Sequence, residues 1–123
     1  MVKKKILIIE DNVMNMELFS DLLEFEGYSI SKAINGKDGF NMAKRNKPNL
    51  ILLDIGLPDM RGIEAVRKFK EDPITKDIIL VICTASIMKE EKEEIMNTGC
   101  DGFIAKPIDA KEFIKTINGF LRN

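Results

Sequence analysis

The sequence predicts an α/β protein, a doubly wound parallel sheet of five strands that are each followed by a helix, (βα)5. Along the whole chain, short apolar runs alternate with longer segments in which apolar residues recur every three or four positions. The runs are almost uninterrupted, as expected for strands that helices cover on both faces. Acidic, hydroxyl and ammonium side chains stand directly after four of these runs. Since the carboxyl ends of parallel strands line one crevice, this placement also favours a parallel sheet.

The first half of the chain is expected to alternate between strand and helix as far as the third strand. Residues 5–9 predict a strand, and Asn12 is expected to cap a helix over about 13–26 that ends at Gly27. The inward stripe of this helix is expected to contain Asn15, Leu18, Phe19, Leu22, Leu23 and Glu26. The next elements are a strand over 28–33, a turn at Asn35-Gly36, a helix over 37–46 closed by Pro48, and a strand over 50–53.

The second half repeats this alternation and completes the sheet. A helix over about 62–71 is expected to turn Ile63, Val66 and Phe69 inward and to stop before Pro73. The remaining elements are a strand over 78–83, a helix over 87–98 ended by Gly99, a strand over 103–105 and a helix over 109–122. Right-handed crossover connections then favour the flavodoxin-like strand order 2-1-3-4-5.

Size, charge and composition limit the function. A chain of 123 residues with 45% apolar residues is expected to form one domain, residues 1–123, with a real core. The formal net charge of -1 argues against a nucleic-acid partner, which would require a basic face. No run approaches the about 20 apolar residues of a membrane span, and no secretory signal is present, so a cytoplasmic protein is expected. Cys83 and Cys100 are expected to be free thiols, and the absence of histidine excludes histidine-based catalysis.

Three carboxylates are expected to meet at the carboxyl ends of two neighbouring strands. Glu10 and Asp11 follow the first apolar run, and Asp54 follows the third. Carboxylates packed together repel one another unless a cation is present, and the hard ion Mg²⁺ takes such oxygen ligands, with Mn²⁺ as the alternative. Acidic residues after strands also serve as helix N-caps, and for Asp11 taken alone that is the better interpretation. The combination with polar residues at the other strand ends favours the metal site.

Asp54 is the carboxylate best placed to react, because a carboxylate can attack phosphorus to give an aspartyl phosphate. Thr84 follows the fourth run and Lys106 the fifth, so a hydroxyl and an ammonium would reach the same crevice and contact phosphoryl oxygens. The Lys106-Pro107 bond is a candidate cis peptide that would direct the lysine into the crevice, and an ordinary trans proline at the start of the last helix is the alternative.

These residues resemble a known family, the response-regulator receiver domains with the CheY-like fold. The resemblance rests on Glu10-Asp11, the LLDIGLPDMRG segment around Asp54, Thr84-Ala85, and Phe103 three residues before Lys106-Pro107. It covers the chain end to end. The opening EDNVMNMELFSDLLEFEGY is most similar to single-domain receivers of the DivK type, and receivers attached to hybrid histidine kinases share its EDN pattern.

The resemblance implies a phosphoryl acceptor that assists its own phosphorylation and dephosphorylation and is not otherwise an enzyme. Asp54 would take the phosphoryl group from a phosphohistidine on a histidine kinase or histidine phosphotransferase. The implied metal ligands are Glu10, Asp11, Asp54 and the backbone carbonyl of Gly56. Thr84 and Phe103 would form the switch, and Phe103, which has no hydroxyl, is expected to turn inward even before phosphorylation. The helix 4–strand 5–helix 5 face would meet a downstream protein target.

Other functions of the same fold fit the residues less well. A phosphohydrolase of the haloacid-dehalogenase type would require a second Asp at the position of Gly56 and room for a cap domain. A flavodoxin-like carrier would require a phosphate loop rich in Ser, Thr and Gly in place of EDNVMN. A receiver that only docks is disfavoured because all five chemical positions are filled. We therefore expect a stand-alone response regulator without an output domain, with a receiver excised from a hybrid histidine kinase or multidomain regulator as the alternative.

Overall fold

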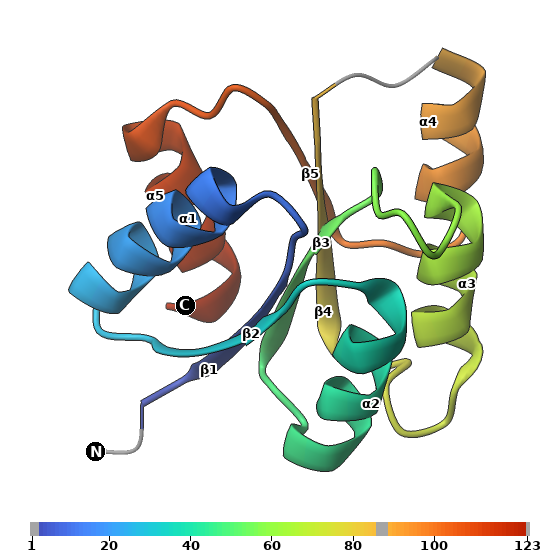
Figure 1. Ribbon diagram of the computed structural model, residues 1–123, viewed down its shortest axis with the longest axis horizontal. Coiled ribbons are helices and arrows are strands. Elements are labelled where there is room, and N and C mark those ends of the chain that lie inside the picture. The colour runs from blue at the N-terminus through green and yellow to red at the C-terminus, as the bar shows by residue number, and fades with distance from the viewer. Residues whose placement is uncertain (1–2, 86–88, 123) are drawn as a thin grey trace.

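The computed structural model describes residues 3–85 and 89–122, in which strands and helices alternate along the chain (Figure 1). The strands are β1 (Lys5–Ile9), β2 (Ser29–Ala33), β3 (Leu50–Asp54), β4 (Ile79–Thr84) and β5 (Gly102–Ala105). The helices are α1 (Val13–Phe25), α2 (Gly36–Asn46), α3 (Gly62–Glu71), α4 (Lys89–Met96) and α5 (Ala110–Leu121). Within these residues, no helix is long and apolar enough to cross a lipid bilayer.

All five strands are parallel and follow the order β2-β1-β3-β4-β5, which confirms the predicted α/β topology. The register places the carboxyl ends of these strands at the same level. Ile9 of β1 pairs with Leu53 of β3, Asp54 of β3 pairs with Cys83 of β4, and Thr84 of β4 pairs with Ala105 of β5. Residues that end or follow β1, β3, β4 and β5 therefore meet at one edge of the sheet.

Helices cover both faces of the sheet, with α1 and α5 on one face and α2, α3 and α4 on the other (Figure 1). Successive strand residues point to opposite faces, so each strand contributes to two cores. Ile6, Ile8, Leu50, Leu52 and Val81 belong to the core under α1 and α5. Leu7, Ile9, Ile51, Leu53 and Ile82 belong to the core under the other three helices. These continuous apolar runs are thus buried on both sides, as the sequence pattern predicted.

The inward face of α1 differs from the predicted stripe. Its buried residues are Met16, Phe19, Ser20 and Leu23, while Leu18 is 45% exposed. The prediction was therefore right for Phe19 and Leu23 and wrong for Leu18. Phe19 fixes the rotation of α1 about its own axis, because its ring stacks on the Phe113 ring of α5 at a centroid distance of 5.3 Å. Turning α1 toward Leu18 would lose this buried aromatic contact.

Several element boundaries shift by one or two residues from the predicted ones. Asp54 and Thr84 are the last residues of β3 and β4 rather than the first residues after them. Asn35 caps α2 through a hydrogen bond from the Asp38 amide, so Asn35-Gly36 starts the helix directly instead of forming a separate turn. Gly27 and Gly99 follow α1 and α4 with φ of 97° and 99°, a backbone conformation that favours glycine.

Helix α4 packs through a thin apolar face. In the residues whose side chains the structure describes, Ile95 is its one fully buried residue, and Met96 is 42% exposed. Residues 86–88, which include the start of the helix predicted over 87–98, lie outside the described residues. Few buried contacts are typical of an element that can shift at low energetic cost.

Both cysteines are free thiols, as predicted, and both are buried. Burial raises the pKa of the Cys83 thiol to about 12, so at about pH 8 Cys83 stays protonated and protected. We expect iodoacetamide to leave Cys83 unmodified in the native protein and to alkylate both thiols in urea, as measured by intact and peptide mass. Alkylation of Cys83 at equal rates in both conditions would contradict its placement in the core.

Candidate functional site

Three carboxylates meet at the carboxyl ends of β1 and β3. Glu10 directly follows β1 and is fully buried, Asp11 is exposed, and Asp54 ends β3 and is buried. Each of them offers an oxygen, and these oxygens lie within 4.8 Å of one another. An open cleft of about 520 Å³ contains the cluster. It is lined by Glu10, Asp11, Asn12, Asn15, Asp54, Gly56, Thr84, Ala85 and Lys106.

Lys106 follows β5 and brings a positive charge into this cluster. Its Nζ donates a hydrogen bond of 2.6 Å to Oε1 of Glu10 and lies 3.5 Å from Oδ2 of Asp54. The ammonium is largely buried. The Lys106–Pro107 peptide bond is cis. The arrangement places one ammonium between two buried carboxylates from different strands.

The buried pair of Glu10 and Lys106 alters both pKa values. Burial raises the pKa of Glu10 above its ordinary 4.5, although the hydrogen bond from Lys106 opposes the increase. For Lys106, burial acts to lower the pKa, but the hydrogen bond to Glu10 and the charge of Asp54 outweigh it and raise the pKa above 10.5. The ammonium is therefore charged at neutral pH, and it offsets part of the carboxylate charge.

Backbone amides hold two of the carboxylates in place. The Asn12 amide donates to Oε2 of Glu10 at 3.1 Å, which leaves Oε1 toward Lys106. The Gly56 amide donates to Oδ1 of Asp54 at 3.0 Å, which leaves Oδ2 toward Lys106. Each carboxylate thus uses one oxygen for the local backbone and presents the other to the centre of the cluster.

Thr84 and Phe103 lie on the neighbouring strands β4 and β5. Thr84 is buried, lines the cleft, and its carbonyl accepts the Lys106 amide at 2.8 Å. Phe103 is half-buried and packs against the core under α2, α3 and α4. The inward preference of its ring stays a prediction.

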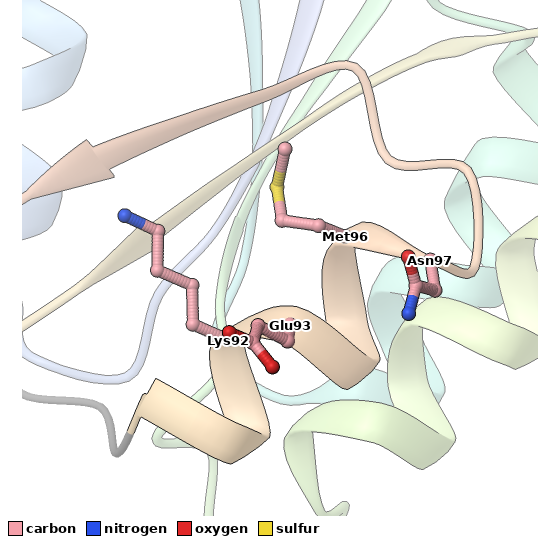
Figure 2. A pocket seen from close by; sticks show the side chains of 4 residues that line it. All are labelled: Lys92, Glu93, Met96 and Asn97. Carbon is pink, nitrogen blue, oxygen red and sulfur yellow. The ribbon is translucent and has the colours of Figure 1, made fainter.

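Helix α4 contacts Phe103 from the side. The Lys92 Nζ lies 5.2 Å from the centroid of the Phe103 ring, within the range of a cation–π interaction. Figure 2 shows Lys92 and Met96 extending from α4 beside a pocket of about 500 Å³, whose other lining residues are Glu93 and Asn97. A residue of the thinly packed helix therefore touches the predicted switch ring.

Sequence reasoning did not assign Asn12, Asn15 and Ala85 to the cleft, although all three line it. Asn12 was predicted as an N-cap and is one, since its Oδ1 accepts the Asn15 amide at 2.9 Å. The sequence did contain a signal for Asn12 and Asn15, namely their position directly after Glu10-Asp11. The first turn of a helix that follows a strand lies beside the end of that strand.

Fold and site together define a class of protein: a doubly wound α/β domain with an acidic cluster and a lysine at the strand ends. Within this class, residues 6–118 match the model of one family, the response regulator receiver domain. The chain belongs to this family.

Relatives and solved structures agree with the assignment. The polar-differentiation response regulator DivK of Brucella anthropi is 40% identical over 118 residues, which cover 96% of either chain, and that of Brucella ovis is 39% identical over the same length. The receiver domain protein (CheY-like) of Methanospirillum hungatei superposes with a TM-score of 0.89 at 30% identity, covering 98% of this chain and 95% of that one. The predicted similarity to DivK-type regulators is thereby confirmed.

A further structure shares the fold at lower identity. The receiver domain of a sensor histidine kinase from Pseudomonas aeruginosa superposes with a TM-score of 0.88 at 23% identity, covering 99% of this chain and 100% of that one. That structure contains a magnesium ion coordinated in its active-site cleft.

Proposed function

We propose that this chain is a stand-alone response regulator of a two-component or phosphorelay system, which accepts a phosphoryl group on Asp54. The observation that carries the proposal is the surroundings of Asp54, with the Lys106 ammonium 3.5 Å from its Oδ2 and two further carboxylates close by. Asp54 thus has a cation nearby, and the two neighbouring carboxylates could bind a metal ion together with it. Phosphoryl transfer depends mainly on such positioning and charge neutralisation.

The donor set fits Mg²⁺, with Mn²⁺ as the alternative. Three carboxylates supply hard oxygen ligands, and the open cleft leaves space for water and phosphate oxygens. Glu10, Asp11, Asp54 and the backbone carbonyl of Gly56 would hold the ion, which would neutralise charge on the phosphoryl group.

The residues of the cleft then have separate roles in the phosphoryl transfer. A carboxylate oxygen of Asp54 forms the bond to phosphorus as the phosphorus–nitrogen bond of the donor phosphohistidine breaks, and the electron pair leaves with the imidazole. The Gly56 amide fixes the other oxygen of Asp54. Lys106 and Thr84, which line the same cleft, contact the phosphoryl oxygens.

The signal is read by another protein, through changed protein–protein contacts of this domain. The DivK relatives are matched over 96% of their own length, which supports a regulator of one domain. The donor is a histidine kinase or histidine phosphotransferase. The output surface is the face of α4, β5 and α5, where Lys92 contacts Phe103, so that movement of Thr84 and Phe103 would change what a target protein meets.

A transfer experiment tests this function. A histidine phosphotransfer domain with radiolabelled phosphate on its histidine is mixed with the chain, with and without Mg²⁺, and the products are separated by gel electrophoresis. We expect the label to move to the chain in the presence of Mg²⁺ and to stay on the donor in EDTA. A label that never appears on the chain with any of several donors would contradict the proposal.

Binding of Mg²⁺ should depend on pH through Glu10. Because the pKa of Glu10 is raised in the folded, metal-free protein, its proton must leave before the carboxylate can serve as a ligand. The contribution of Glu10 to the stability of the metal-free protein is present at low pH and is lost as the pH rises through this raised pKa, and the carboxylate becomes available to a metal ion over the same range. The increase in Tm caused by MgCl2 should thus be smaller at about pH 5 than at about pH 7.5, with NaCl of equal ionic strength as the control. Equal increases at both pH values would contradict this placement of Glu10.

A further inference from the structure

The loop between β3 and α3, residues 55–61, carries Gly56 and is attached to a helix distant in sequence. The Asp59 carboxylate accepts the amide of Gly36 at 2.9 Å and the amide of Lys37 at 3.0 Å, each through a different oxygen. These partners lie 23 and 22 positions earlier in the chain. Asp59 therefore attaches the loop to the first turn of α2.

Met60 strengthens this attachment. A Cβ added to Gly36 would lie 2.7 Å from the Met60 Sδ, so the Met60 side chain occupies the space that any other residue at position 36 would fill. Met60 also packs against the core under α2, α3 and α4. Two consecutive loop residues thus seat the loop on the start of α2, one through hydrogen bonds and one through packing.

The same loop is fixed on its other side by β3. Ile55 and Leu57 are buried in the core, and the Gly56 amide bonds to Asp54. Gly56 thus lies between two buried residues, Ile55 and Leu57, and three residues before Asp59, with Pro58 restricting φ in the short connection. Its carbonyl has little freedom as long as both attachments hold.

Helix α2 has a cap of its own without Asp59. Asn35 Oδ1 accepts the Asp38 amide at 2.8 Å, and Asn35 Nδ2 donates to Asp38 Oδ2 at 3.1 Å. Asp59 binds two other amides of the first turn, which have no partner within the helix. The hydrogen bond from Gly36 is the largest cause of a lowered pKa for Asp59, so its carboxylate is charged at neutral pH.

We propose that Asp59 is a positioning residue for the metal site: by docking the β3–α3 loop on the first turn of α2, it orients the Gly56 carbonyl toward the ion. The inference rests on the proposed function, since it assumes that Gly56 is a ligand. Asp59 itself does not line the cleft that contains the carboxylate cluster.

The test measures Mg²⁺ affinity directly. The ¹⁵N-labelled chain is titrated with MgCl2, and the dissociation constant is obtained from amide shifts at the cleft, including that of Gly56. We compare wild type, Asp59→Ala, Asp59→Asn and Asp38→Ala. Asp38→Ala is the matched control, because it removes a carboxylate from the same helix start without touching the loop. Thermal unfolding of each variant, measured separately, identifies a temperature at which all of them are folded.

We expect Asp59→Ala to bind Mg²⁺ at least about tenfold more weakly than wild type, since residues that orient a metal ligand typically change metal affinity by about 10-fold to 100-fold. Asp59→Asn keeps one acceptor oxygen, so its Mg²⁺ affinity should lie between those of wild type and Asp59→Ala. It replaces Asp59→Ala in the comparison if the alanine variant does not fold. Asp38→Ala should bind as wild type does.

Wild-type affinity in both Asp59 variants, or equal weakening in Asp59→Ala and Asp38→Ala, would overturn the inference and leave the proposed function standing. A wild-type chain that shows no saturable Mg²⁺ binding would overturn the proposed metal site and this inference with it.

Discussion

Replacing Asp54 by Asn is expected to abolish the uptake of a phosphoryl group from acetyl phosphate. The carboxamide has nearly the shape of the carboxylate, and its oxygen can still accept the Gly56 amide, so the backbone around position 54 should be kept. It lacks the anionic oxygen that would attack phosphorus, and it no longer attracts the Lys106 ammonium 3.5 Å away. Loss of the nucleophile should thus remove the reaction itself, whereas changes at Thr84 or Lys106 should only slow it.

The measurement is the intact mass of the protein after incubation with acetyl phosphate and MgCl2. We expect one phosphate adduct on wild type and none on Asp54→Asn. Asp21→Asn is the matched control, because Asp21 is an exposed carboxylate of α1 outside the cleft, and it should take up phosphate as wild type does. An adduct that persists in Asp54→Asn, or that disappears in Asp21→Asn, would contradict the assignment of the acceptor.

The largest effect on stability is expected for Phe113→Ala. Phe113 is fully buried on α5 and stacks on Phe19 of α1 with an interplanar angle of 22°, so the pair joins the two helices over one face of the sheet. Removing the ring leaves a cavity that the surrounding strands cannot fill. The free energy of unfolding should fall by about 3–5 kcal/mol, a large part of the stability of a small domain.

Urea unfolding followed by far-ultraviolet circular dichroism measures this change. Phe25→Ala is the control, since it deletes the same ring from a position that is 89% exposed on α1. It should change the free energy of unfolding by no more than about 0.5 kcal/mol. Equal changes in the two variants would contradict the described core.

The sequence was sufficient for the fold because its signals are local and agree with one another. Apolar runs such as Leu50–Leu53 are too short for helices and too continuous for half-exposed strands, which leaves buried parallel strands. Once the strands are parallel, their polar ends have to meet at one edge. The convergence of Glu10, Asp54 and Lys106 at that edge could therefore be predicted without any knowledge of the packing.

Features that depend on contacts distant in sequence could not be predicted in this way. Helix α1 contains so many apolar residues that two overlapping stripes are compatible with its period, and the stack between Phe19 and Phe113 selects one of them. The attachment of Asp59 to Gly36 and Lys37 is similar, because nothing near Asp59 in the sequence identifies its partners. The contact of Lys92 with Phe103 likewise depends on how α4 lies against β5.

One measurement tests the central claim most directly: chemical mapping of the phosphoryl group. Wild-type protein is treated with acetyl phosphate and MgCl2, reduced with borohydride, which converts an aspartyl phosphate to homoserine, and digested for peptide mass analysis. We predict homoserine at position 54 in the Mg²⁺ sample and aspartate there in a parallel EDTA sample. Homoserine at another acidic residue, or an adduct that resists borohydride and maps to a hydroxyl or lysine side chain, would contradict the claim that Asp54 is the phosphoryl acceptor.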